Sequence, residues 1–502
     1  PGSPPPPGRL RASLAPPRLS AMPPLLPLLS FLPLLPALAA ASARAPLGSK
    51  EAFVHLFEWS WDDVALECER WLGPKGFAAV QVSPPNEHAT GDEWYARYQP
   101  VSYVLTSRSG NETQFASMVR RCKAAGVGVY ADAVFNHMAG PWGGVGIAGS
   151  EYGNRSYPIY SPWDFHHVKG TDAYNCGVVN YDDKYNVQFC DLAGMPDLCT
   201  GCPYVQKTVA AYINRMAEIG IAGIRVDAAK HQDPKELGRL LAMVDKNLFR
   251  FQEVLYGGTV NSSSYVANGR VCEFRYAESL APKFATPGQF AKDLATIGTK
   301  WGFHQGRDSV VFVDNHDTQR DGSARLTYKS GRAYVLANVF MLAHPYGYPK
   351  VMSSYAFSNV TRGPPAEPVH GPGGLVRCGP GQPWICEHRH PGLAAMIAWR
   401  RVAGVAPISL FHTSERGNIL ALCRGRSACV AINRSGRAFE LHVETSLPSG
   451  WYCDVFNSGD GACDVIHVIA GRKVVLTVPA MGAVAMHIGA TAKAAPALRG
   501  GD

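Results

Sequence analysis

The chain has 502 residues, of which 46% are hydrophobic, 10% aromatic and 18% charged. This length exceeds what one ordinary hydrophobic core organises, so it predicts several domains or a large barrel. The aromatic content excludes a disordered main body. The net charge is +8, but half of it comes from four arginines in the first 45 residues, and the other basic residues are dispersed. Without a basic stripe, we expect no nucleic-acid partner.

The N-terminal region predicts an export signal. A leucine-rich apolar run follows Met22 and ends in small-residue sites of the A-x-A type at 41–43 and 43–45, which is typical of a secretory signal peptide. We assign residues 1–45 to an upstream extension (1–21) and a signal peptide; a proline-rich disordered leader is the alternative. Prolines interrupt the apolar run, and no later stretch is apolar over 18 residues, so we expect no membrane association.

The 13 cysteines favour disulfides and an extracellular location. The expected pairs are Cys68/Cys122, Cys176/Cys190, Cys378/Cys386, Cys423/Cys429 and Cys453/Cys463. A zinc site at Cys199 and Cys202 is the competing interpretation, but no second Cys-x-x-Cys or His pair at zinc spacing follows. These two cysteines and Cys272 have no assigned partner, and the odd total leaves at least one thiol unpaired. We therefore expect a secreted protein.

Short apolar runs alternate with helical patterns along much of the chain. The runs lie at 53–57, 78–82, 127–135, 221–227, 249–254, 271–276, 309–314 and 339–343, and helical patterns at 62–72, 112–125 and 205–219 separate some of them. Nearly continuous apolar strands indicate a parallel sheet covered on both faces. Eight strand–helix units predict a (β/α)₈ TIM barrel. The rival doubly wound sheet lacks a Gly-x-Gly-x-x-Gly after its first strand.

Two segments depart from this alternation of strands and helices. Residues 137–196, rich in Gly, Pro, Tyr and Cys, are too long for a simple loop after the third strand, so we predict an inserted domain there. After residue 408, short runs at 420–423, 428–432, 439–443, 452–456, 465–469 and 474–478 predict an all-β sandwich. The expected domains are a barrel at 46–408 holding the insertion, a C-terminal β-sandwich at 409–490 and a tail at 491–502.

Three carboxylates follow predicted barrel strands, where active groups of TIM barrels gather. Asp227 ends the fourth run, Glu253 lies in the fifth, and Asp317 follows the seventh. An acid after a strand is more often a helix cap than a catalyst. However, each of these acids lies in a motif: 223–231 (Gly-Ile-Arg-Val-Asp-Ala-Ala-Lys-His), 251–254 (Phe-Gln-Glu-Val) and 312–317 (Phe-Val-Asp-Asn-His-Asp).

With the segment 132–137 (Asp-Ala-Val-Phe-Asn-His), these motifs resemble the four motif regions of animal-type, chloride-dependent alpha-amylases, a family of glycoside hydrolases. The similarity spans about residues 50–490 and includes 54–59 (Val-His-Leu-Phe-Glu-Trp), 81–86 (Gln-Val-Ser-Pro-Pro-Asn) and 340–346 (Phe-Met-Leu-Ala-His-Pro-Tyr). The resemblance implies a catalytic barrel, an inserted B domain and a C-terminal β-sandwich. It also implies endo-hydrolysis of α-1,4 bonds in starch, glycogen and maltooligosaccharides, with retention of configuration.

By this resemblance, Asp227 is the nucleophile, Glu253 the acid/base, and Asp317 stabilises the oxocarbenium-like transition state. Arg225 lies two residues before Asp227 on the same strand face, where its charge can keep the nucleophile ionised. A structural salt bridge is the alternative for Arg225. The residues implied to contact substrate are Trp94, Tyr95, Tyr98, Gln99, His137, Arg225, Lys230, His231 and His316. Core packing is the alternative for the aromatic ones.

The resemblance also implies two ions. The calcium positions are Asn136 and Asp197 through side chains, and Gln188 and His231 through backbone carbonyls; calcium prefers such oxygen ligands. The family usually has Arg in place of Gln188, which a carbonyl ligand tolerates. The chloride positions are Arg225, Asn315 and Lys350. Many animal members carry Arg instead of Lys350, but Lys still supplies a cation.

Two other functions stay open. A glucan-transferring enzyme would share the fold and site and pass the glycosyl group to another sugar instead of water, and no residue separates it from a hydrolase. A non-catalytic carbohydrate-binding barrel is the third possibility, but such relatives typically lack one of the three acids. We expect a monomer whose partner is the polysaccharide substrate. After Asp317, residues 319–328 replace the Gly-rich mobile loop of the family, so loop closure there need not follow that of relatives.

Overall fold

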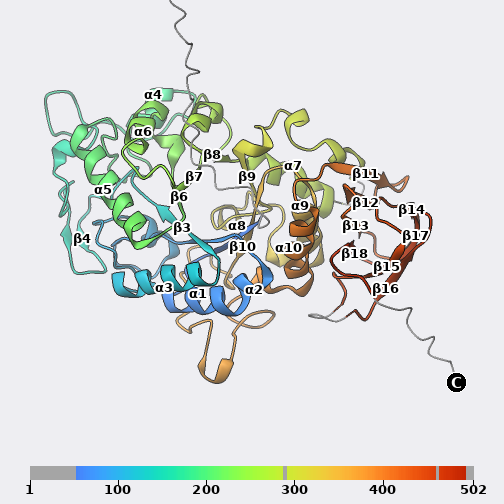
Figure 1. The fold of residues 1–502 in the computed structure, drawn as a ribbon. Coiled ribbons are helices and arrows are strands. Elements are labelled where there is room, and N and C mark those ends of the chain that lie inside the picture. Colours follow the sequence, from blue (N-terminus) through green and yellow to red (C-terminus); the bar gives the residue numbers. More distant parts are fainter. Residues whose placement is uncertain (1–51, 287–290, 459–462, 493–502) are drawn as a thin grey trace, which may run out of the picture. The chain divides into compact units, whose positions relative to one another are not determined.

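Residues 52–286, 291–458 and 463–492 are described by the computed structural model. The predicted signal region and residues 493–502 of the predicted tail lie outside them. Eight parallel strands close into a barrel in the order β1-β10-β9-β8-β7-β6-β3-β2 (Figure 1), which confirms the TIM barrel. They are β1 (Phe53–Leu56), β2 (Ala79–Val82), β3 (Gly128–Ala133), β6 (Gly223–Val226), β7 (Phe249–Gln252), β8 (Arg270–Cys272), β9 (Ser309–Val311) and β10 (Tyr348–Ser353).

Local sequence signals set the ends of several helices. α3 begins at Asn111, whose side chain accepts from Gln114 N while Gln114 accepts from Asn111 N, a capping box. α5 has Pro203 in its first turn and ends at Gly220, which has a left-handed φ of 111°. The helices outside the insertion are α1 (Trp61–Glu67), α2 (Gly73–Lys75), α3 (Glu112–Ala124), α5 (Pro203–Ile219), α6 (Pro234–Leu241), α7 (Phe274–Ala285), α8 (Thr318–Asp321), α9 (Arg332–Ala343) and α10 (Pro391–Ala403).

The eighth strand lies elsewhere than predicted. Residues 339–343 form the end of α9, and the strand that closes the barrel is β10. Every residue of this apolar segment is buried. A helix buried on all sides has the same uninterrupted apolar sequence as an interior strand, so periodicity does not separate the two. The sixth predicted strand was also too long, because α7 begins at Phe274.

The barrel interior has an aromatic layer below a polar one. Phe53, Tyr130 and Tyr348 belong to one buried cluster near the amino ends of their strands. Two residues further along, the inward positions are occupied by His55, Asp132 and Lys350, because side chains alternate between the two faces of a strand. All three are buried. The fold therefore places a buried polar layer on the side of the barrel where the strands end.

The segment between β3 and α5 contains a small hairpin and a helix. The hairpin pairs β4 (Gly144–Val145) with β5 (Glu151–Tyr152), and the helix is α4 (Lys184–Phe189). Cys176 and Cys190 are bonded within this segment. The boundaries predicted for the inserted domain, 137–196, stay a prediction.

The C-terminal part is all-β, as predicted (orange to red in Figure 1). β11-β12-β13-β18 form one antiparallel sheet, and β14-β17 and β15-β16 form two further pairs. The strands are β11 (Ile408–Thr413), β12 (Ile419–Arg424), β13 (Ala428–Asn433), β14 (Phe439–Glu444), β15 (Gly450–Cys453), β16 (Ile466–Ile469), β17 (Lys473–Val478) and β18 (Gly482–His487). The Trp399 indole of α10 donates to Cys429 O and Met486 O at 3.0 Å.

Six disulfides lie within the described residues. All five expected pairs are formed. Cys199 and Cys202 are bonded to each other, which excludes the zinc interpretation, while Cys272 is a buried free thiol. Among the described helices, none has both the length and the hydropathy needed to cross a bilayer.

Candidate active site

Arg225 holds three carboxylates together where the strands end. Its Nη1 donates to both oxygens of Asp132, at 2.7 and 2.8 Å, and to Oδ1 of Asp227 at 2.6 Å. Its Nη2 lies 2.8 Å from Oε1 of Glu253. All four residues are buried. The proposed nucleophile and acid/base thus share one guanidinium, although 26 residues separate them in the chain.

A strained turn after β6 orients Glu253. Ala228 has a φ of +47°, a left-handed conformation that costs a non-glycine residue free energy and is frequent at functional sites. In this turn its backbone N–H donates to Oε2 of Glu253 at 2.9 Å. Glu253 is therefore fixed through both oxygens, one by Arg225 and one by the turn that follows Asp227.

Asp317 joins the same site through an aromatic stack. Its Oδ2 lies 3.3 Å from Nε2 of His316, and its side chain is 36% exposed. The His316 ring stacks on Tyr98 with centroids 5.0 Å apart, and the Tyr98 hydroxyl donates to Asp132 at 3.1 Å. A cavity of about 500 Å³ borders this side and is lined in part by Tyr256 and by Thr318, the neighbour of Asp317.

Two of the three proposed catalytic acids, Asp227 and Asp317, have raised pKa values. Burial raises the pKa of Asp227 well above its usual value; Arg225 opposes this, and the charges of Glu253 and Asp132 add to it. Burial, followed by the charge of Glu253, raises the pKa of Asp317 to about 7. Arg225 lowers the pKa of Asp227, in the direction that its place two residues earlier predicts, but this one guanidinium is shared by three carboxylates and burial acts in the opposite direction.

The predicted substrate-contacting residues differ in exposure. Trp94, Tyr95 and Tyr98 lie in one 3-10 turn (Trp94–Tyr98) after β2. Tyr95 is 40% exposed, whereas Tyr98 is buried under His316. Gln99 follows the turn, and its Oε1 accepts from Gly140 N at 3.4 Å. Of these side chains, Tyr95 is the one most available to a ligand, and Tyr98 packs beneath the site.

The two histidines nearest this turn are neutral. Burial lowers the pKa of His137 to about 4 and that of His316 well below its usual value. The Nε2 atom of His137 lies 2.9 Å from Tyr98 O. Both rings are therefore suited to hydrogen bonding and not to carrying charge. Lys230 and His231 lie on the short turn after Ala228, where Lys230 donates to Gly257 O at 2.8 Å.

The predicted calcium positions lie in two pairs, and two of their side-chain oxygens have no hydrogen-bond partner among the described residues. Leu198 N donates to Asn136 O at 2.9 Å, which brings Asp197 beside Asn136. The His231 ring contacts Val187 O at 2.9 Å, next to Gln188. Oδ1 of Asn136 and Oε1 of Gln188 are buried without a hydrogen-bond partner among the described residues, and Asp197 is buried. Unsatisfied buried oxygens beside a carboxylate fit a calcium ion.

The predicted chloride positions form a set of donors. Oδ1 of Asn315 accepts from Asp317 N and Thr318 N at 3.0 and 2.7 Å, so its amide NH₂ is the end available to an anion. Lys350 on β10 is buried, and its Nζ lies 4.8 Å from the Phe312 ring centroid. Asn315 and Lys350 thus offer an amide donor and a cation, groups that suit a small anion, while the third position, Arg225, is also bonded to three carboxylates.

Two residues of the site were not assigned from sequence. Asp132 is a charged residue inside an otherwise apolar strand and lies in register with Arg225 on β6; this interruption was the signal that could have identified it. Arg320 donates to His316 O at 2.7 Å, and its guanidinium lies 4.9 and 5.5 Å from the ring centroids of Phe57 and Trp94. No sequence pattern pointed to Arg320.

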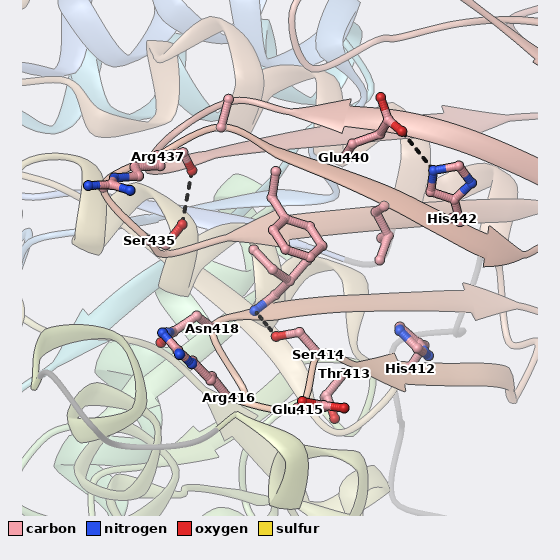
Figure 2. A pocket seen from close by; sticks show the side chains of 15 residues that line it. His412, Thr413, Ser414, Glu415, Arg416, Asn418, Ser435, Arg437, Glu440 and His442 are labelled. Carbon is pink, nitrogen blue, oxygen red and sulfur yellow. Dashed lines mark hydrogen bonds and ion pairs between the residues drawn. The ribbon is translucent and has the colours of Figure 1, made fainter.

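A larger hollow, about 1050 Å³, lies in the C-terminal part between the β11–β12 turn and β14 (Figure 2). Its two acids are Glu415 in the turn and Glu440 on β14, and the Glu440 carboxylate points to His442 at 2.7 Å. Because no paired carboxylates meet there, this hollow is not the candidate active site.

A parallel β/α barrel with carboxylates gathered at its strand ends defines the class of TIM-barrel enzymes, and carboxylate pairs are the groups that glycoside hydrolases use. Residues 412–489 match the family model described as alpha amylase, C-terminal all-beta domain. The alpha-amylase of Tribolium castaneum is 41% identical over 447 residues, covering 82% of this chain and 88% of that protein. An alpha-amylase-related protein of Drosophila atripex is 39% identical, with 88% and 91% covered.

Solved structures also show similarity to alpha-amylases. A glutamate-to-glutamine variant of alpha-amylase I from Eisenia fetida, in complex with maltohexaose, has a TM-score of 0.81 and 34% identity, covering 88% of this chain and 98% of that one. The chain belongs to the alpha-amylase family of glycoside hydrolases, and it is an enzyme. This agrees with the resemblance in its sequence motifs; the roles of individual residues stay predictions.

Proposed function

We propose that this enzyme cleaves internal α-1,4 bonds of starch, glycogen and maltooligosaccharides with retention of configuration. The observation that carries the proposal is the single guanidinium of Arg225, which binds both Asp227 and Glu253. Two carboxyl groups bound by one guanidinium are near neighbours, and in retaining glycosidases the nucleophile and the acid/base are closer together than in inverting ones.

The chemistry follows from the environment of each acid. Asp227 attacks the anomeric carbon, while Glu253 gives its proton to the departing glycosidic oxygen and then accepts one from the attacking water. Asp317 and neutral His316 hydrogen-bond the sugar at the cleavage point, and Trp94, Tyr95, Gln99, His137, Lys230 and His231 are proposed contacts around it.

The test is release of reducing ends from soluble starch, with the configuration of the new end followed by NMR during the first minutes. We expect α-configured products and a rapid fall in chain length. In a second reaction that starts from maltoheptaose, products longer than the substrate would favour glucan transfer. With either substrate, β-configured products would contradict retention.

We also propose that the protein acts outside the cell as a monomer. Six disulfides favour an oxidising compartment, and one chain supplies every residue of the site. A chain found mainly inside expressing cells, or a dimer in sedimentation, would contradict these two points.

Calcium is proposed to be held by Asn136, Gln188, Asp197 and His231, where it would link the inserted segment to the barrel. Removing it with EGTA is expected to lower the melting temperature by several degrees, because a ligand that binds only the native state stabilises it. Calcium, but not magnesium, should restore the value, since magnesium demands tighter octahedral geometry. Asn136→Ala should melt like the chelated protein and not respond to EGTA. Equal melting of wild type with and without EGTA contradicts the site.

Chloride is proposed to bind at Arg225, Asn315 and Lys350, where its charge would favour the protonated form of a nearby general acid. Activity of enzyme dialysed free of chloride is expected to rise about tenfold on titration with chloride, which corresponds to about 1.4 kcal/mol of barrier. Lys350→Gln should abolish the response and Lys350→Arg should keep it, because both Lys and Arg supply a cation. A flat response of the wild type contradicts the anion site.

A further inference from the structure

Trp142 is largely exposed to solvent and lies on the inserted segment between β3 and α5. Its side chain is 68% exposed, and the residues Val145 and Ile147 on the same hairpin are also exposed. Leaving a large aromatic face in water is unfavourable, and exposed apolar patches commonly mark binding surfaces. This exposed indole is therefore a candidate binding surface.

The hairpin that carries Trp142 is fixed to the barrel. Thr90 donates to Val145 O through Oγ1 at 3.0 Å, and Oε1 of Glu87 accepts from Ala148 N and Ser150 N at 3.0 and 3.1 Å. Before Trp142, Ala139 N donates to Pro100 O at 2.7 Å. The indole is thus presented on backbone that is attached on both sides to the segment after β2.

That segment is the one that carries the proposed substrate contacts. Gly140 N donates to Oε1 of Gln99, and the Trp142 ring packs directly on Gly140, where a Cβ would lie 1.9 Å from the ring. Glycine at position 140 therefore lets the indole lie directly over the residue whose N–H is bonded to Gln99. After His137 the chain runs beside residues 98–100. It then reaches Trp142.

We propose that Trp142 is a sugar-stacking platform that extends the substrate site past Gln99 and sets the preference for long chains. This inference rests on the proposed function. The apolar C–H face of a glucose unit stacks on an aromatic ring, and an anchored indole loses little freedom when it binds. The unit on Trp142 lies away from the bond being cleaved, so long α-glucans reach it and short ones do not.

The experiment compares Trp142→Ala with wild type on maltoheptaose and maltotriose. We expect kcat/KM for maltoheptaose to fall about fivefold to tenfold, within the range of a lost aromatic contact, and that for maltotriose to stay unchanged. Trp142→Tyr should keep most of the wild-type kcat/KM for maltoheptaose. Trp163→Ala is the matched control, because Trp163 is also exposed in the inserted segment, at 55%, and its ring contacts His167 at 5.3 Å.

Binding is measured separately in a Glu253→Gln background, which should hold oligosaccharide without cleaving it. Maltohexaose should change the tryptophan fluorescence of this variant, and the added Trp142→Ala change should reduce that signal and weaken binding by the same factor. Equal effects of Trp142→Ala on both chain lengths, or none, overturn the platform. A change in oligomeric state with unaltered sugar binding would assign Trp142 to a protein contact and also overturn it. Failure of wild type to cleave starch would instead reject the proposed function.

Discussion

Asp227→Asn is expected to lower kcat on starch by at least about ten-thousandfold, which corresponds to more than about 5 kcal/mol of barrier. The amide cannot attack the anomeric carbon, so the covalent step is lost. The variant should fold, because an amide has the same shape as the carboxyl group and Arg225 keeps Asp132 and Glu253 as charged partners. We therefore expect a melting temperature near that of wild type.

Asp233→Asn is the matched control for this change. Asp233 lies six residues away and caps α6 by accepting from Lys235 N and Glu236 N at 2.9 and 3.2 Å. Asn caps helices about as well as Asp, so both activity and stability should stay near wild type. Near-normal turnover of Asp227→Asn would show that another residue is the nucleophile.

Glu67→Ala is expected to lower the free energy of unfolding by about 3–5 kcal/mol, the cost of leaving buried charges unpaired. Glu67 is fully buried at the end of α1. Its Oε1 lies 2.8 Å from Nε2 of His388 and its Oε2 lies 2.5 Å from Nη2 of Arg389. Burial would raise the pKa of Glu67, but hydrogen bonds from His370 and His388 outweigh it and lower the pKa. The group is therefore ionised at pH 7, where urea unfolding should be measured.

Glu69→Ala provides the comparison two residues away. Glu69 pairs with Arg121 at 2.7 Å, but the two side chains are 40% and 29% exposed. Exposed ion pairs contribute below about 1 kcal/mol because water screens them. Since the pKa of Glu67 is lowered, its contribution should persist above the ordinary range of a glutamate and disappear as the pH falls below it. Equal losses for both variants would contradict the buried cluster.

The sequence alone predicted those features whose signal lies within a short stretch of residues. Apolar runs located seven of the eight barrel strands, because an interior parallel strand is apolar on both faces. Cysteines 6–14 residues apart predicted four of the six disulfides, since short separations leave few alternative partners. The C-terminal strands were predicted from their short runs, although β11 and β18 were missed. The motifs with Asp227, Glu253 and Asp317 indicated a glycoside hydrolase from sequence alone.

Only the tertiary structure decided which distant groups meet. It moved the eighth strand from 339–343 to β10, because burial on all sides removes the periodicity that separates a helix from a strand. It set Asp132 against Arg225 through the register of neighbouring strands, and so made Arg225 the shared partner of three carboxylates. It also packed the Trp142 ring on Gly140, whose N–H donates to Gln99. The pattern along a chain reports which face of an element is buried, whereas the closure of the barrel determines what that face contacts.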